Sequence, residues 1–253
     1  MRNRTRFLQC ALGAWEMLSD LRLPVVSCPG RQTAESLVCF PLWGALCGVL
    51  GALVWKAASL LTNRLAGAAV FAVAVCAFML AKDSCRGIKS LGLWAVNGFR
   101  LGSLGAALKQ LHPVRGDDDQ NVLLASIACA LAEFVLLLLL GRYRAVWYLP
   151  FVLAGGFTVQ GVLAAEFGLV ADPDRRNLKK MWIAFGVIGL LSFLVFPLST
   201  VIGAVAVYAL AVPAVKFIRA NVAAPGADLV TLWGSLAELA LLLSGFFWTI
   251  RLG

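Results

Sequence analysis

The sequence predicts an all-α fold: a polytopic bundle of about seven transmembrane helices with a cytoplasmic N-terminus. Of its 253 residues 61% are hydrophobic and only 14% are charged, whereas about a quarter of a soluble domain is charged. The mean hydropathy is +0.87. Seven apolar stretches are long enough, or nearly so, to cross a hydrocarbon core of about 30 Å. The basic residues alternate in density between the connections, as in multi-pass membrane proteins.

The seven apolar stretches follow one another from residue 40 onward. Backbone groups inside a bilayer must be hydrogen-bonded within the chain, so each stretch is expected to be a helix. The second and the sixth are the shortest. The glycine-rich run at 44–51 places small residues where helix backbones can approach closely. The predicted spans are 40–61, 65–81, 122–140, 145–170, 181–198, 201–215 and 229–250.

The distribution of Lys and Arg sets the orientation. Alternate regions of the chain hold 17 of the 22 basic residues, and the regions between them hold 5. The positive-inside rule therefore places the basic regions in the cytoplasm and the C-terminus outside. We expect a multi-pass protein of a bacterial inner membrane, with an amphipathic cytoplasmic segment at 1–39 and a transmembrane domain at 40–253. Its cytoplasmic loops are 82–121, 171–180 and 216–228.

Several classes of function find no support in the composition. The net charge of +9 indicates topology and contact with anionic lipid rather than nucleic acid in a chain this apolar. The seven cysteines are scattered and form no C-x-x-C pair, so they favour small packing residues over a zinc site or a disulfide framework. His112 is the only histidine, which leaves little for a histidine-based metal site or general base.

Three glutamates and one glutamine fall within the predicted spans. Glu133, Gln160 and Glu238 lie well inside them, and Glu166 lies near a cytoplasmic end. An ionisable group in a span is costly and faces a partner or a wet cavity. A packing role and a functional role both fit Glu133 and Glu238. Glu166 is expected to extend to the interface. A small transporter is one hypothesis that these residues raise.

Two acidic clusters lie in the cytoplasmic loops. The triplet 117–119 (Asp-Asp-Asp) offers carboxylates to a divalent cation, or it favours the N-terminus of the helix that follows. Asp172 and Asp174 precede Arg175 and Arg176, a pattern typical of a solvated turn.

Three segments together resemble the cobalamin synthase family, the adenosylcobinamide-GDP ribazoletransferases. The family's T-R-L-P-V motif aligns with LRLPV at 21–25, and its F-P-L-x-G motif aligns with FPLWG at 40–44. Its C-terminal G-x-T-G-D-x-x-G-A segment, which runs into a helix with two glutamates, aligns with 224–238. Asp228 and Glu238 match there, and Ser235 replaces the first glutamate. The resemblance covers essentially the whole chain.

The resemblance implies a magnesium-dependent phosphotransferase of the CDP-alcohol type. Such an enzyme joins adenosylcobinamide-GDP to alpha-ribazole or its phosphate and releases GMP in the last step of cobalamin biosynthesis. The residues that carry over as catalytic are Asp228 and Glu238, and Arg22 carries over to substrate binding.

The family's central D-G-x-x-D-x-x-D-G motif, which holds the metal, has no counterpart. Segment 82–99 contains one acid, Asp83, which is the only candidate metal ligand there. In one placement the three aspartates become Arg86, Ser90 and Leu93, and in another they become Leu91, Ala95 and Asn97. Arg86 and Lys89 would repel a cation, but they can bind phosphate or anionic headgroups.

Two main hypotheses follow. The first is an active transferase, in which Asp83 and residues 117–119 would have to supply the magnesium site. The second is a degenerate, non-catalytic paralogue, a pseudoenzyme that binds a ligand or a protein partner in the membrane, or forms a homo-oligomer. The replacement of the aspartates by basic and apolar residues favours the second hypothesis.

Overall fold

Helix α7 (Leu149–Glu166) lies at the centre of the bundle in the structure, a computed structural model of the chain. It is surrounded by α2 (Cys39–Leu61), α8 (Arg175–Phe193), α9 (Pro197–Asn221) and α10 (Ala227–Leu252). The structure describes residues 11–12, 14, 34–82, 85–109, 120–170, 174–222 and 225–252. These residues form helices and no strand, which confirms the all-α prediction within the described part.

Glycines allow the close approach of the helices around α7. Gly44 and Gly48 of α2 lie directly on the backbone of α7, where a methyl group would clash with Leu153 and with Pro150. Pro150 is in the first turn of α7, where its missing N–H costs no helical hydrogen bond. Small residues at a helix contact let van der Waals packing replace the hydrophobic effect, which is absent between helices in lipid.

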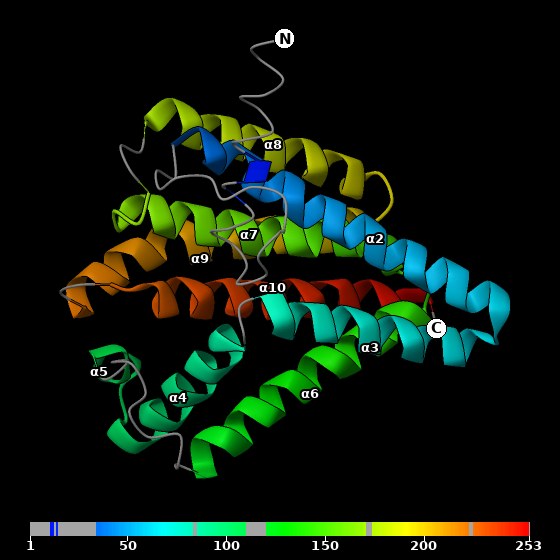
Figure 1. Cartoon of the computed structure of the whole chain (residues 1–253), viewed down its shortest axis with the longest axis horizontal. Coiled ribbons are helices and arrows are strands. Elements are labelled where there is room, and N and C mark those ends of the chain that lie inside the picture. Colours follow the sequence, from blue (N-terminus) through cyan, green and yellow to red (C-terminus); the bar gives the residue numbers. More distant parts are fainter. Residues whose placement is uncertain are drawn as a thin grey trace.

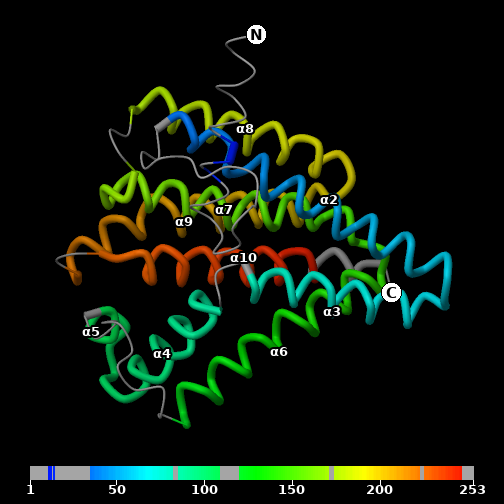
Figure 2. Tube along the Cα trace, in the orientation of Figure 1, coloured from blue at the N-terminus to red at the C-terminus, as the bar shows by residue number. Residues whose placement is uncertain are grey.

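The remaining helices lie on the other side of α10 (Figures 1 and 2). Helix α3 (Arg64–Lys82) packs on α2 and on α6 (Gln120–Arg142). Helix α6 is tilted away from the central helices and is mostly exposed: only 22% of its apolar 18-residue stretch is buried. Two short 3-10 helices, η1 (Ala34–Val38) and η2 (Val146–Tyr148), lead into α2 and α7.

Six of the described helices are long and apolar enough to cross a membrane, which confirms a multi-pass membrane bundle. They contain the predicted spans 40–61, 65–81, 122–140 and 201–215, and most of 145–170 and 229–250. Helix α8 is not among them because Arg175, Arg176, Lys179 and Lys180 occupy its first two turns.

Contacts at the two ends of the bundle define the path of α8. Arg219 of α9 pairs with Glu166, so α7 and α9 finish at the same end. At the opposite end, Tyr148 before α7 bonds to Ser199 in the first turn of α9. Thr200 of α9 also bonds to Ser192 near the end of α8. Helix α8 therefore runs the length of the bundle, as Figure 1 shows.

The boundary between the predicted fifth and sixth spans is wrong. The apolar run was expected to remain one span over 181–198, but α8 ends at Phe193 and α9 begins at Pro197. A turn at 194–196 separates them. The turn residues are themselves apolar, so hydropathy does not mark it, whereas proline at the start of α9 is a regular helix-start signal. Helix α9 extends beyond the predicted 201–215 at both ends.

Segment 82–121, expected as a connecting loop, contains two helices, α4 (Arg86–Leu101) and α5 (Leu104–Lys109). Helix α4 is amphipathic and buries Ile88 and Leu91 on the side that packs against α6 and α10. It lies at the end of the bundle where α10 begins (Figure 1). The predicted cytoplasmic loop is thus partly a folded layer over that end.

Candidate functional site

Both predicted catalytic acids lie on α10. Asp228 is half-buried in the first turn, where its main-chain carbonyl accepts a hydrogen bond from Thr231 Oγ1 at 3.0 Å. Glu238 follows ten residues later, which is about 15 Å along the helix axis at 1.5 Å per residue. Metal–oxygen bonds to Mg²⁺ are about 2.1 Å. Asp228 and Glu238 therefore do not meet at one metal ion.

Glu238 is enclosed between α10 and α7. Its side chain is 1% exposed and lies over Gly156 of α7. A Cβ placed on Gly156 would be 2.5 Å from Cγ and 2.7 Å from Oε1 of Glu238. The glycine is therefore what makes room for the carboxyl group at this depth of the bundle.

A second polar residue repeats this arrangement in reverse. Gln160 of α7, 4% exposed, lies over Gly234 of α10, and any side chain at that glycine would overlap the Gln160 amide. Each helix thus carries a glycine and, four residues later, a polar residue: Gly156 with Gln160, and Gly234 with Glu238. Since the helices are antiparallel, the two polar residues are anchored one helical turn apart in the α7–α10 interface, each against the glycine of the other helix. This geometry is that of interlocked helix packing.

Arg86 and Lys89 lie in the first turn of α4, and both are exposed. Residues three apart share a helix face, so the two cations point the same way. Helix α4 is held against α6 at Gly92, which lies on Ser126. The Trp94 ring lies 5.6 Å from that of Trp233 of α10. Helix α4 and the first part of α10 are therefore neighbours in the structure.

Several predicted site residues lie outside the described residues. These are Arg22, Asp83 and the triplet 117–119; Asp172 and His112, for which no site role is predicted, also lie outside them. The residues that the structure does describe contain no group of three or more His, Cys, Asp or Glu side chains that could hold a metal ion.

Glu133 occupies a different interface from Glu238. It is 1% exposed on α6, one turn after Cys129, and it lies near Cys76 of α3. It thus belongs to the contact between α3 and α6, whereas Gln160 and Glu238 belong to α7 and α10. The three residues behind the transporter hypothesis do not share one interface.

Glu166 lies at the end of α7, as expected for a side chain that reaches the interface. Arg219 Nη2 lies 2.7 Å from its Oε2 and 3.0 Å from its main-chain carbonyl oxygen. Arg219 therefore binds both the carboxylate of Glu166 and its main-chain carbonyl group. The last carbonyl groups of a helix have no hydrogen-bond donor within the helix, and Arg219 supplies one. Both side chains are exposed, and their role is to join the ends of two helices.

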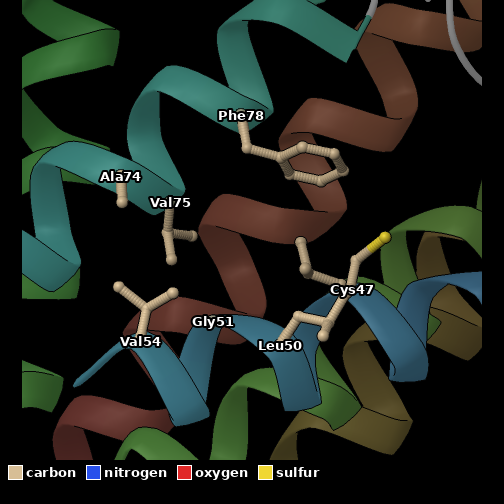
Figure 3. A pocket seen from close by; sticks show the side chains of 8 residues that line it. Cys47, Leu50, Gly51, Val54, Ala74, Val75 and Phe78 are labelled. Carbon is tan, nitrogen blue, oxygen red and sulfur yellow. The ribbon is translucent and has the colours of Figure 1, made fainter. Parts of the chain in front are cut away.

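A hydrophobic groove of about 180 Å³ runs between α2 and α3. Figure 3 shows the side chains of Leu50 and Val54 facing those of Ala74, Val75 and Phe78 across it. The sulfur of Cys47 is the only heteroatom among the labelled side chains. Such a lining suits lipid chains and offers nothing to a nucleotide, so the groove is not part of the predicted site.

No protein-family model, no curated protein and no solved structure matches the chain. The resemblance to the cobalamin synthases therefore rests on the three sequence segments at 21–25, 40–44 and 224–238.

The sequence analysis missed the glycine partners of the buried polar residues. Gly156 and Gly234 each stand four residues before Gln160 and Glu238, and this repeated spacing was the available signal. It also missed a pocket with two arginines and two tryptophans at the other end of the bundle, which is described below.

Proposed function

We propose that the chain is a non-catalytic relative of the cobalamin synthases in a bacterial inner membrane. In this proposal it binds a phosphate-bearing ligand at its cytoplasmic face and does not transfer it. The observation that carries the proposal is the position of the two retained acids. They are about 15 Å apart along α10, and Glu238 is committed to packing against Gly156.

In this proposal the chain crosses the membrane seven times, which puts the proposed site on the cytoplasmic side. Helix α8 runs between the two ends of the bundle, and its basic first two turns lie at the end where α7 finishes and α10 begins. Long basic side chains at a helix end reach the headgroups while the rest of the helix stays in the hydrocarbon. Counting α8 as a span gives the alternation that the distribution of Lys and Arg predicts.

The ligand-binding groups in this proposal are Arg86 and Lys89. Two cations on one exposed helix face can hold phosphate oxygens without a metal ion. Candidate ligands are adenosylcobinamide-GDP, whose diphosphate carries the negative charge, and the anionic headgroups of the inner leaflet. The largely exposed helix α6 leaves room for a membrane partner protein or for a second copy of the chain.

The second candidate function is the transferase itself, with alpha-ribazole as the acceptor and magnesium as the cofactor. One observation favours it. Helix α4 begins three residues after Asp83 and packs against α10 near Trp233, five residues after Asp228. The chain segments that follow these two acids are therefore neighbours in the fold.

Two measurements on the full-length protein in nanodiscs separate the candidates. The first incubates it with adenosylcobinamide-GDP, alpha-ribazole and magnesium and measures GMP. We expect no GMP above that of a sample without protein. GMP release that stops on chelation and in Asp83→Ala would contradict the non-catalytic proposal and support the transferase.

The second measurement is equilibrium binding of adenosylcobinamide-GDP, followed by its absorbance, without magnesium. We expect binding by the unmodified protein and a loss of about tenfold or more when Arg86 and Lys89 are both changed to Gln, since each cation near a surface contributes about 1 kcal/mol. The matched control is Arg175→Gln with Arg176→Gln, which removes the same charge from the start of α8. Equal losses in the two double variants would show that the binding is not located at α4.

A further inference from the structure

A pocket of about 410 Å³ lies at the end of the bundle opposite α4. It is formed where α2 ends, α3 begins and α6 connects to α7. This volume is in the range of about 300–1,000 Å³ found for small-molecule sites. Its lining is polar and aromatic, unlike the groove between α2 and α3. The lining residues are Trp55, Ser59, Arg64, Arg144 and Trp147.

Among the residues that the structure describes, no acidic side chain lines this pocket to balance its positive charge. Arg64 and Arg144 line it, and Lys56 and Arg142 stand close by in the sequence. None of the 13 Asp and Glu residues of the chain falls within 54–66 or 141–148. The positive-inside rule makes this the end with few basic residues, yet two of its five cations line one cavity and two more are their near neighbours in the sequence. An anion is the missing counterpart.

The backbone holds Arg144 in a conformation that disfavours any side chain. Its φ is +59°, in the left-handed region that favours glycine. The Ala145 N–H bonds to the Leu140 carbonyl at 2.9 Å, and the Arg144 N–H bonds to the Gly141 carbonyl at 3.3 Å. These two bonds form a Schellman motif at the end of α6, whose left-handed residue is most often glycine. An arginine in this position indicates a use for its side chain.

The aromatic residues place the pocket at headgroup depth. Trp147 is 47% exposed and Tyr143 is 39% exposed, and such residues gather where the bilayer meets water. Trp55 contributes a further feature, because its indole N–H is buried and finds no acceptor among the described residues. The site thus combines cationic donors with walls that sit between lipid and water.

We propose that this pocket binds a phosphate group on the non-cytoplasmic side of the membrane, with Arg64 and Arg144 as its ligands. Arginine presents several N–H donors in a plane that matches phosphate oxygens. The helix dipole of α3 adds to the attraction, since Arg64 is its first residue. The phosphate belongs either to an anionic lipid of the outer leaflet or to a soluble phosphate ester on that side. This site is independent of the proposed cytoplasmic function.

The test uses full-length protein in phosphatidylcholine nanodiscs, into which phosphatidylglycerol is titrated, with bound lipid read by native mass spectrometry. We expect Arg64→Gln and Arg144→Gln each to weaken binding about fivefold. Lys56→Gln and Arg142→Gln, which remove the same charge nearby, should change it less than twofold. Equal losses in all four variants would overturn the proposal, because they would show a diffuse surface charge and no site.

Arg144→Gly separates binding from folding. Glycine relieves the left-handed conformation, so the thermal unfolding temperature of this variant should stay the same or rise. Its affinity for phosphatidylglycerol should still fall about fivefold. Full affinity in this variant would refute the role of the arginine. If glycerol 3-phosphate displaces phosphatidylglycerol, the site is assigned to soluble phosphate esters. If it does not displace the lipid, the site is assigned to the lipid. Both results support a phosphate site.

Discussion

The hydroxyl groups of Tyr148 and Ser244 lie 2.7 Å apart in the interior, where the beginning of α7 meets the last third of α10. The Tyr148 hydroxyl also donates to the Ser199 main-chain carbonyl at 2.8 Å, which brings in the first turn of α9. One phenol therefore joins three helices that are far apart in the sequence. Its ring packs on Phe151 and Phe196.

Tyr148→Phe should lower the free energy of unfolding by about 1 kcal/mol. The substitution keeps the ring contacts but removes the hydroxyl, so the buried Ser199 carbonyl loses this donor and Ser244 loses one partner. Hydrogen bonds between membrane helices contribute about 0.6 kcal/mol on average and up to about 1.7 kcal/mol. The measurement is reversible unfolding in mixed micelles, with both variants in the same detergent.

The control for this substitution is Tyr208→Phe. Tyr208 lies on α9 and is 58% exposed, so removal of its hydroxyl should leave the free energy of unfolding within about 0.3 kcal/mol. If the two variants were equally destabilised, the effect would come from the change of residue type and not from the hydrogen bonds of Tyr148.

Gly156→Ala should destabilise the bundle by about 1–3 kcal/mol, the usual cost of an extra methyl group in a packed core. The new methyl group would overlap the side chain of Glu238 and push α7 from α10. Gly186→Ala on α8 is the matched control. Nothing lies within 4 Å of the Cβ position at Gly186, and alanine is the better helix former, so this variant should be unchanged or more stable by up to about 1 kcal/mol. Thermal unfolding of both variants decides the point.

Glu238→Gln should leave the stability within about 0.5 kcal/mol, whereas Glu238→Ala should cost about 2 kcal/mol. Gln has the same shape and preserves the contact with Gly156, while Ala leaves a cavity in the α7–α10 interface. These outcomes follow if Glu238 is a packing residue. Unfolding curves give the stability, and GMP release in the same samples gives the activity. If the unmodified protein does release GMP, a loss of that release in Glu238→Gln with unchanged stability would instead identify a functional carboxylate.

The sequence was sufficient to predict most of the long apolar helices but not how they interlock. Hydropathy located α2, α3 and α6 because each is a long apolar run between polar connections. It misplaced the junction of α8 and α9, because the turn at 194–196 is apolar and tight. Helix α4 was not predicted because its apolar residues cover only one face.

In the candidate site too, the sequence predicted features within one helix but not the contacts between helices. The sequence indicated that Glu238 needs an explanation, since a carboxyl group in a span is costly. Its explanation is Gly156, which lies 82 positions earlier in the chain on another helix. Such a contact depends on the rotation and the depth of two helices, and neither is fixed by the pattern within one of them.

The orientation of α8 gives the last prediction. If α8 crosses the membrane, Val195 after its end lies outside the cell membrane and Lys179 near its start lies inside. Both positions are accessible, since Val195 and Lys179 are exposed in the bundle. In a variant whose native cysteines are replaced, Val195→Cys should react with an impermeant maleimide added to intact spheroplasts, because the outer side is open to the reagent.

Lys179→Cys should react only after the membrane is permeabilised, and Thr62→Cys, between α2 and α3, should react from outside as a reference. A surface helix at α8 would place Val195 and Lys179 on one side, and the two cysteines would then label alike. That result would also break the alternation on which the placement of α4 in the cytoplasm depends, because α9 and α10 would reverse. Different labelling of these two residues is therefore what the seven-crossing topology requires.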